Sequence, residues 1–369
     1  MQKRSDMAFE FWQESNFWWL TGLEEPDWVL IIEGNNEWLV RPDSTETSQI
    51  FNGSSTLDDI HRITGIDNII TGHEAKGLLD KLAKKHDTVA ALGQHPHHKY
   101  FDFYQNPTQG LLQRKLKRVF NNIYDCRGDL AKLRAIKQPQ EIQAIEQAVD
   151  LTVEGFRLIS NKLQSYQYEY QIEADFSYFF RSNGASGHAY DPIIAAGKNA
   201  CTLHYSINNS AIKAQQLLLI DVGAKISGYS ADITRTYAIS KPTKRQRQIH
   251  QAVEDAHHKI IGLLKPGLLI KDYQIQSDSI MKDALKIAGL YSSDSDYRKY
   301  FPHAISHGLG VDVHDSLGGF KEFKEGMVLT VEPGIYIPEE SIGIRIEDDI
   351  LITSDGNRNL SAKLPTNLL

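Results

Sequence analysis

Two aspartates on a predicted β-hairpin are the first residues of this sequence that could do chemistry. Residues 217–237 read LLLIDVGAKISGYSADITRTY, and the Ser-Gly pair within them is typical of a hairpin turn. A four-residue turn over residues 225–228 would place Asp221 directly opposite Asp232. Opposed side chains lie about 4.5–5.5 Å apart at Cβ, so two carboxylates there repel each other. The pattern indicates a bound cation, with two solvated acids on an exposed face as the alternative.

Two later segments add an acid and several imidazoles. Residues 327–337 (MVLTVEPGIYI) predict a strand that ends at Glu332, because the Pro-Gly pair that follows breaks the ladder. Residues 303–315 (HAISHGLGVDVHD) are rich in glycine and carry three histidines, which are His303, His307 and His314. A lone histidine is more often a core residue, but three within one short segment beside an acidic strand end suggest a site.

A last segment, residues 343–349 (GIRIEDD), alternates apolar side chains with Arg345 and Glu347 on one face. Taken alone, this arrangement could be a simple ion pair. Taken together, four acids at strand ends or on one strand face and one histidine within the glycine-rich segment could form a metal site. Their four carboxylates carry a formal charge of −4, which two divalent ions would neutralise. Carboxylates with one imidazole suit Mn²⁺, Co²⁺, Fe²⁺ or Zn²⁺ better than a thiolate-binding metal, so we predict a dinuclear site.

The elements that must position these residues follow from periodicity and from helix-end signals. In the later part of the chain we expect helices at 139–163, 170–183, 243–264 and 271–288, and strands at 217–223, 229–238, 327–332 and 343–353. In the earlier part we expect a hairpin at 28–41, helices at 74–86 and 111–120, and a strand at 88–93. The segment before Pro139 is the expected junction, which gives an N-terminal α/β domain (1–133) and a C-terminal domain (134–369).

Composition excludes several classes of protein. The chain has 369 residues, 41% apolar and 24% charged, which is ordinary for a folded protein of two domains. Its net charge of −7 argues against nucleic acid as a partner. No apolar run approaches the roughly 20 residues of a membrane helix, and the first 12 residues lack the apolar core of a signal peptide. Two cysteines, Cys126 and Cys201, fit a reducing compartment, so we expect a cytoplasmic protein without a membrane partner.

Two further features have ordinary interpretations. The aromatic residues between Phe9 and Trp19 could form a ligand platform, but we expect core or subunit-interface packing. The histidines of HPHH (95–98) could bind metal, but we expect a solvated loop, because neighbouring side chains around a proline point in different directions.

The chain resembles the pita-bread metallopeptidases, which include methionine aminopeptidase, prolidase, aminopeptidase P and the metal-free creatinase. The resemblance rests on the five candidate ligands in order and on four motifs, which are LHY (203–205), DITRT (232–236), VEPGIY (331–336) and GIRIEDD (343–349). It implies an α+β fold, with a C-terminal pita-bread catalytic domain preceded by a smaller creatinase-like α/β domain. Residues 15–32 (SNFWWLTGLEEPDWVLII) resemble the N-terminal domain of aminopeptidase P, which favours Xaa-Pro cleavage. Because the chain starts close to this segment, we expect part of that domain's first strand and helix to be absent.

The same resemblance implies roles for the site residues. Asp221, Asp232, His307, Glu332 and Glu347 would hold two divalent ions, with Mn²⁺ expected first and Co²⁺, Zn²⁺ or Fe²⁺ as alternatives. A hydroxide bound by both ions would attack the peptide, and Glu332 would shuttle the proton to the leaving nitrogen. His314 would bond the developing oxyanion, with Asp315 fixing its tautomer. His204 and His303 would line the substrate cleft, and Arg345 would orient the metal ligands.

The expected activity is removal of the first residue from peptides with proline in second position, by a homodimer or homotetramer. One alternative is a prolidase that cuts only Xaa-Pro dipeptides. Another is a non-catalytic peptide-binding module on the same fold, and a third is a metal-free creatinase-like hydrolase. Both of the last two would have lost ligands of the five-residue pattern, and all five are present here.

Overall fold

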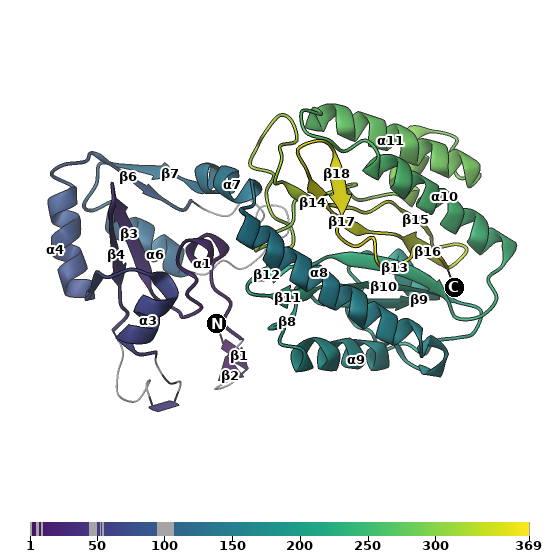
Figure 1. Ribbon diagram of the computed structural model, residues 1–369, viewed down its shortest axis with the longest axis horizontal. Coiled ribbons are helices and arrows are strands. Elements are labelled where there is room, and N and C mark those ends of the chain that lie inside the picture. Colours follow the sequence, from purple (N-terminus) through teal and green to yellow (C-terminus); the bar gives the residue numbers. More distant parts are fainter. Residues whose placement is uncertain are drawn as a thin grey trace. The chain divides into compact units, whose positions relative to one another are not determined.

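The computed structural model describes residues 2–4, 7–8, 10–43, 50–51, 53, 55–93 and 107–368. The chain divides into two compact units, Met1–Leu130 and Ala131–Leu369. Figure 1 shows mixed helix and strand in both units, as the α+β prediction requires. The division falls within helix α7 (Arg127–Ala135).

The first unit is built around short sheets. Its elements are β1 (Gln2–Arg4), β2 (Met7–Ala8), α1 (Ser15–Thr21), β3 (Val29–Glu33), β4 (Asn36–Val40), α3 (Leu57–Thr64), β5 (Ile69–Ile70), α4 (Gly72–Leu82), β6 (Thr88–Ala91), α6 (Pro107–Leu116) and β7 (Asn122–Asp125). The predicted hairpin is confirmed, because β3 pairs with β4 in antiparallel register. Helix α4 begins with a capping box, in which Thr71 and Glu74 satisfy each other's backbone N–H groups.

The aromatic segment of the first unit divides between core and surface. Phe17 packs against a small core that contains Leu23 and Leu39, as expected. Phe11 and Trp12 are exposed at 41% and 47% of their surface. Phe9 and the histidines of HPHH (95–98) lie outside the described residues.

The second unit holds the long helices and most of the strands. Its elements after α7 are α8 (Pro139–Ser160), the 3-10 helix η1 (Leu163–Ser165), α9 (Glu169–Ser182), β8 (Gly187–His188), β9 (Ile193–Ala196), the 3-10 helix η2 (Gly197–Cys201), β10 (Leu217–Val222), β11 (Ala224–Ile226), β12 (Tyr229–Ser230), β13 (Ile233–Ala238), α10 (Lys244–Ile261), α11 (Ile270–Ile287), α12 (Asp294–Tyr300), β14 (Val328–Val331), β15 (Gly334–Ile337), β16 (Ile342–Arg345), β17 (Asp348–Ile352) and β18 (Asn357–Asn359). In Figure 1 strands such as β10, β13 and β17 lie between α8 and α9 on one side and α10 and α11 on the other, whereas β8 lies beside α9.

This placement explains why the central strands of the second unit are buried. Every residue of β10 is buried, as is every residue of β13, β14 and β17. Strands β13, β10 and β9 form one sheet in that order, and β14, β17 and β18 form another. The main hydrophobic core of this unit is shared by helices and strands. Val253 of α10 and Leu285 of α11 belong to the same buried cluster as Leu329 of β14. The four predicted helices are confirmed to within a few residues of each end.

The predicted register of the hairpin is wrong. The turn has two residues, Ser227 and Gly228, both with positive φ (49° and 78°), rather than four. Two left-handed residues give a turn whose twist matches the paired strands, so the tighter turn is favoured. The pairing therefore shifts, and Asp221 faces Thr234 instead of Asp232. The strand expected at 229–238 is interrupted at residues 231–232, between β12 and β13.

None of the described helices is both long and apolar enough to cross a bilayer.

Candidate metal centre

The five candidate ligands come from segments at or between strand ends. Asp221 is in β10, and Asp232 immediately precedes β13. Glu347 occupies the gap between β16 and β17, where it bridges to Thr234. Glu332 follows β14, and His307 lies in the glycine-containing loop before that strand.

Three of these residues meet directly. One ligand atom from each of Asp232, His307 and Glu347 lies within 4.8 Å of the others. The Nε2 atom of His307 is 3.5 Å from Asp232 Oδ2 and 3.5 Å from Glu332 Oε1. The structure therefore brings Glu332 to the same imidazole as Asp232.

Asp221 joins the cluster through Tyr190, a residue that the sequence did not point to. The Tyr190 hydroxyl lies 2.5 Å from Asp221 Oδ1 and 2.6 Å from Asp232 Oδ1. One hydroxyl has one proton, so it can donate to only one of these carboxylates at a time. Tyr190 is in the segment between β8 and β9, and its sequence context, HAYD, carries no signal of this role.

Arg345 lies beneath the cluster and is itself buried. The Nη2 group of Arg345 donates to Asp221, and its Nη1 group donates to the Tyr336 hydroxyl at 3.0 Å. Its Nε donates to Thr234 Oγ1 at 3.0 Å, and Thr234 donates in turn to Glu347 at 2.6 Å. Arg345 thus contacts Asp221 directly and reaches Glu347 chiefly through a threonine, an intermediary that the sequence did not reveal.

Three further histidines were predicted at the site, and they are linked to this cluster in different ways. The Nε2 atom of His303 lies 2.8 Å from the Tyr336 hydroxyl, and its Nδ1 lies 3.4 Å from Glu332 Oε2. Burial lowers the pKa of His303 to about 3, with a further contribution from the charge of Arg345. The ring of His314 is exposed and lies 4.3 Å from the ring of His307, at 67° to it. His204 is also exposed, and its charge is among those that lower the pKa of His303.

Asp315, expected to fix the tautomer of His314, is engaged elsewhere. Its carboxylate accepts a hydrogen bond from Arg134 at 3.0 Å and lies 3.6 Å from the Lys137 ammonium. Its Oδ1 also accepts from the backbone N–H of Ser316. These contacts fasten the segment that carries His314, and the role of Asp315 toward the His314 tautomer stays a prediction.

The electrostatics of the cluster are those of acids crowded in a buried space. Burial raises the pKa of Glu332 to about 7 and that of Glu347 well above its usual value, and the charge of Asp232 adds to both shifts. Burial opposes a charge on His307, but hydrogen bonding to Asp232 and the charge of Glu332 raise its pKa to about 9. In this cluster the raised pKa values mean that bound protons neutralise part of the negative charge of the acids. Divalent cations would compensate the same charge, so the donor set fits such ions.

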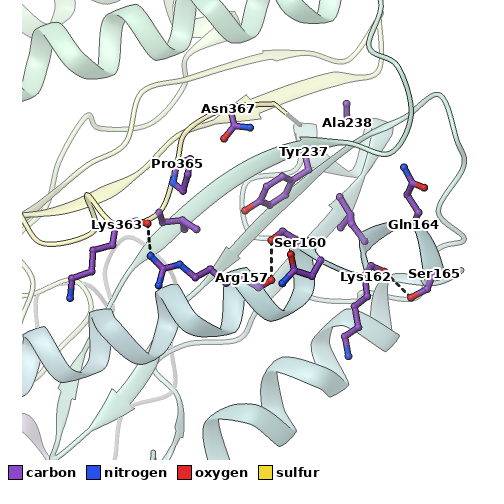
Figure 2. Close-up of a pocket in the computed structure, with 13 residues that line it drawn as sticks. Arg157, Ser160, Lys162, Gln164, Ser165, Tyr237, Ala238, Lys363, Pro365 and Asn367 are labelled. Atoms are coloured by element: carbon purple, nitrogen blue, oxygen red, sulfur yellow. Dashed lines mark hydrogen bonds between the residues drawn. The ribbon is translucent and has the colours of Figure 1, made fainter.

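A separate cavity of about 980 Å³ lies in the same unit (Figure 2). Arg157 of α8 and Tyr237 of β13 border it, together with the C-terminal segment around Lys363. Among the described residues that line it, none is a candidate metal ligand or one of the site histidines. This cavity is therefore distinct from the metal centre.

Comparison with known proteins identifies the family. The model of metallopeptidase family M24 matches residues 143–354, more than half of the chain. The chain belongs to metallopeptidase family M24. Residues 1–90 of this M24 chain match the aminopeptidase P N-terminal domain, in agreement with the two-domain prediction.

Individual relatives of this M24 chain extend over nearly its full length. The Xaa-Pro aminopeptidase of Haemophilus influenzae is 32% identical over 398 residues, which cover 99% of this chain and 88% of the relative. The solved low-pH form of aminopeptidase P from Escherichia coli has a TM-score of 0.84 at 30% identity, covering 99% of this chain and 89% of that one. A zinc-substituted form of the E. coli enzyme in complex with product has a TM-score of 0.83. This M24 chain is an aminopeptidase P-like metallopeptidase, a hydrolase of a family that uses divalent metal ions.

Proposed function

We propose that the chain is an Xaa-Pro aminopeptidase that hydrolyses the first peptide bond of substrates with proline in second position. The observation that carries this proposal is the buried cluster of Asp221, Asp232, His307, Glu332 and Glu347. It occurs in a chain that aligns over nearly its whole length with Xaa-Pro aminopeptidases. All five positions retain residues that can bind a metal, which argues against a non-catalytic module.

We further propose that these five residues hold two divalent ions, with Mn²⁺ as the first candidate and Co²⁺, Zn²⁺ or Fe²⁺ as alternatives. Asp232 and Glu347 are central to the arrangement, because their oxygens lie within 4.8 Å of each other and of His307. Bound divalent ions supply Lewis acidity, which lowers the pKa of water and polarises a carbonyl oxygen. Arg345 and Tyr190 hold the ligands in place through their hydrogen bonds to Asp221.

Glu332 is proposed to move the proton. Glu332 is a largely buried carboxylate within reach of the other ligands, and a carboxylate held at a reacting centre can accept and return a proton. Its carboxylate would take a proton from the attacking water and deliver it to the proline nitrogen. That nitrogen leaves as a secondary amine, so it must be protonated. His307 and Thr330, whose side chains lie 3.5 Å and 3.3 Å from Glu332 Oε1, hold this carboxylate in position.

The three site histidines other than His307 are proposed to bind the substrate. His314 lies beside His307 with its ring open to solvent, where it could donate a hydrogen bond to the oxygen on which negative charge develops. His303 is kept neutral by burial and can therefore both donate and accept, and His204 would line the other side of the cleft.

Steady-state hydrolysis tests the proposal directly. Purified protein loaded with Mn²⁺ should release the first residue of Xaa-Pro-Yaa tripeptides faster than it cleaves Xaa-Pro dipeptides. An Xaa-Ala-Yaa tripeptide is the matched substrate control and should be cleaved poorly. Cleavage of dipeptides alone would identify a prolidase, and failure of the metal-loaded protein to cleave either would indicate a binding module.

The cytoplasmic location and the homodimer or homotetramer belong to the same proposal. Two well-separated cysteines, Cys126 and Cys201, support a reducing compartment, and both are free thiols in the structure. Sedimentation analysis at micromolar concentration tests the oligomeric state.

A further inference from the structure

We propose that Glu169 is a positioning residue for His204, because its buried carboxylate fastens the loop that carries this histidine. The inference rests on the proposed function, which places His204 in the substrate cleft. Glu169 is the first residue of α9 and has no exposed surface. It is distant in sequence from all five candidate metal ligands.

The carboxylate of Glu169 accepts four hydrogen bonds, two at each oxygen. Oε1 accepts from the backbone N–H of Ala196 at 2.8 Å and from the Asn199 amide at 2.9 Å. Oε2 accepts from the Tyr205 hydroxyl at 2.8 Å and from the backbone N–H of Ser210 at 2.8 Å. The donors span residues 196–210, so one carboxylate joins the beginning, the middle and the end of the loop.

The hydrogen-bonding capacity of the Glu169 carboxylate is taken up by the loop. A carboxylate offers about four acceptor positions, and all of them are used here. Among the described residues, no basic side chain forms an ion pair with Glu169. A buried carboxylate must be compensated by hydrogen bonds, and here the loop alone provides them. Any change in the loop that removes these donors is therefore unfavourable.

The loop that Glu169 fastens holds His204 at the surface of the protein. Leu203 and Tyr205 pack against a buried cluster that includes Tyr336, while His204 between them is exposed. The Cys201 thiol donates to the Ile342 carbonyl at 3.3 Å, which holds the base of the loop against β16. The hydroxyl of Tyr336 lies 2.8 Å from His303, so the loop packs on a residue that touches the site.

Replacing Glu169 with glutamine removes the carboxylate but keeps the volume of the side chain. An amide puts an NH₂ group where one oxygen was, and each oxygen of Glu169 faces two donors. Neither orientation of the glutamine can therefore satisfy the loop. Glu173, one turn later in α9, is a matched control: it accepts a single bond from the Asn208 amide at 2.9 Å, which a glutamine oxygen can also accept.

The experiment is a double-mutant cycle measured on a Xaa-Pro-Yaa tripeptide. Glu169→Gln and His204→Ala should each lower kcat/KM by about 10- to 100-fold, because a misplaced or missing substrate contact costs that order of rate. Both variants should keep the metal content of the wild type. The double variant should be no slower than His204→Ala alone, and Glu173→Gln should stay within about twofold of the wild type. Losses that multiply in the double variant, or a wild-type rate for Glu169→Gln, would overturn the inference.

A second readout keeps the inference testable if the activity fails. In histidine-labelled protein, the NMR signal that disappears in His204→Ala belongs to His204. Glu169→Gln should shift or broaden that signal, and Glu173→Gln should not. If the wild type cleaves no Xaa-Pro peptide, the proposed function is wrong, but this signal still decides the positioning role. If Glu169→Gln does not fold, Tyr205→Phe removes one of the four bonds, and an unchanged His204 signal in that variant would overturn the inference.

Discussion

At the scale of single residues, each of the two aspartates is held by a different set of partners. Asp221 is bound by Arg345 on one oxygen and by Tyr190 on the other. Asp232 has His307 on one oxygen and Tyr190 on the other. The sequence predicted that both aspartates belong to one site, although through a direct opposition across the hairpin that the structure does not show. It could not predict Tyr190, because that contact depends on the spatial placement of a segment more than 30 residues upstream.

Asp232 is expected to be essential for binding metal. Asp232→Ala removes a carboxylate that lies within 4.8 Å of both His307 and Glu347, so both ions should be held weakly. Turnover of Xaa-Pro-Yaa should fall by about 10³-fold or more, since metal activation of water is lost. Elemental analysis of the purified variant gives the ions per chain. Asp255→Ala, an exposed change in α10, is the control, and two tightly held ions with normal turnover in Asp232→Ala would refute the assignment.

The two neighbouring histidines are expected to differ. His314→Ala should keep the metal content of the wild type while lowering kcat by about 10²–10³-fold, because a donor to the developing oxyanion is lost. His307→Ala should instead empty one metal site, since its Nε2 lies 3.5 Å from two of the proposed ligands. Metal analysis and kcat of both variants check this. The opposite pattern, with His314→Ala depleted and His307→Ala fully loaded, would show that the roles are exchanged.

At the scale of elements, the sequence predicted the type of each segment better than its pairing. The four long helices follow from apolar periodicity and end signals, which are local properties. The register of the β-hairpin was wrong by two residues, because the turn length was assumed rather than observed. The interruption at residues 231–232 could not be predicted either, since it arises where Asp232 leaves the ladder toward the site.

Gly223 is expected to be required for this interruption. A Cβ at this position would lie 1.7 Å from the carbonyl oxygen of Ala231 and 3.2 Å from the ring of Tyr190. Gly223→Ala should therefore lower the free energy of unfolding by about 1–3 kcal/mol and weaken metal binding, because the strand that carries Asp221 must move away from Asp232.

The matched control is Gly77→Ala in helix α4, where no atom lies within 4 Å of the added Cβ. That change should be neutral or should stabilise by about 0.5–1 kcal/mol, as alanine does in a helix. Urea unfolding and metal titration of both variants provide the measurement. Equal stability and metal affinity for Gly223→Ala and the wild type would contradict this prediction.

At the scale of the whole molecule, the site depends on contacts between distant parts of the chain. Thr234 and Glu347 are 113 residues apart, and Asp221 and Arg345 are 124 apart. Periodicity and spacing carry no information about such contacts. The full set of five ligands could be named from the sequence only because their order resembles that of a known family.

The second unit also buries histidines that are not part of the metal cluster. His257 in α10 is 1% exposed, and burial lowers its pKa to about 4, with the charge of Asp348 opposing the shift. Burial likewise lowers the pKa of His188 to about 4 and lowers that of His250. These groups are neutral in the folded protein at pH values where they are protonated in the unfolded chain, whose histidines have a pKa near 6.5.

The buried histidines are expected to make the fold sensitive to acid. Between about pH 6.5 and pH 4 the unfolded chain binds more protons at His257 than the folded protein does, so stability falls as the pH falls through this window. His257 alone should account for about 2–3 kcal/mol of the loss between pH 7 and pH 4. His257→Gln cannot titrate there and should flatten the dependence by that amount, whereas His258→Gln, the exposed neighbour on the same helix, should not. The free energy of unfolding in urea, measured with a chelator present at every pH so that ion release does not contribute, decides between them. Identical pH dependence for the two variants would mean that His257 is not kept neutral by burial.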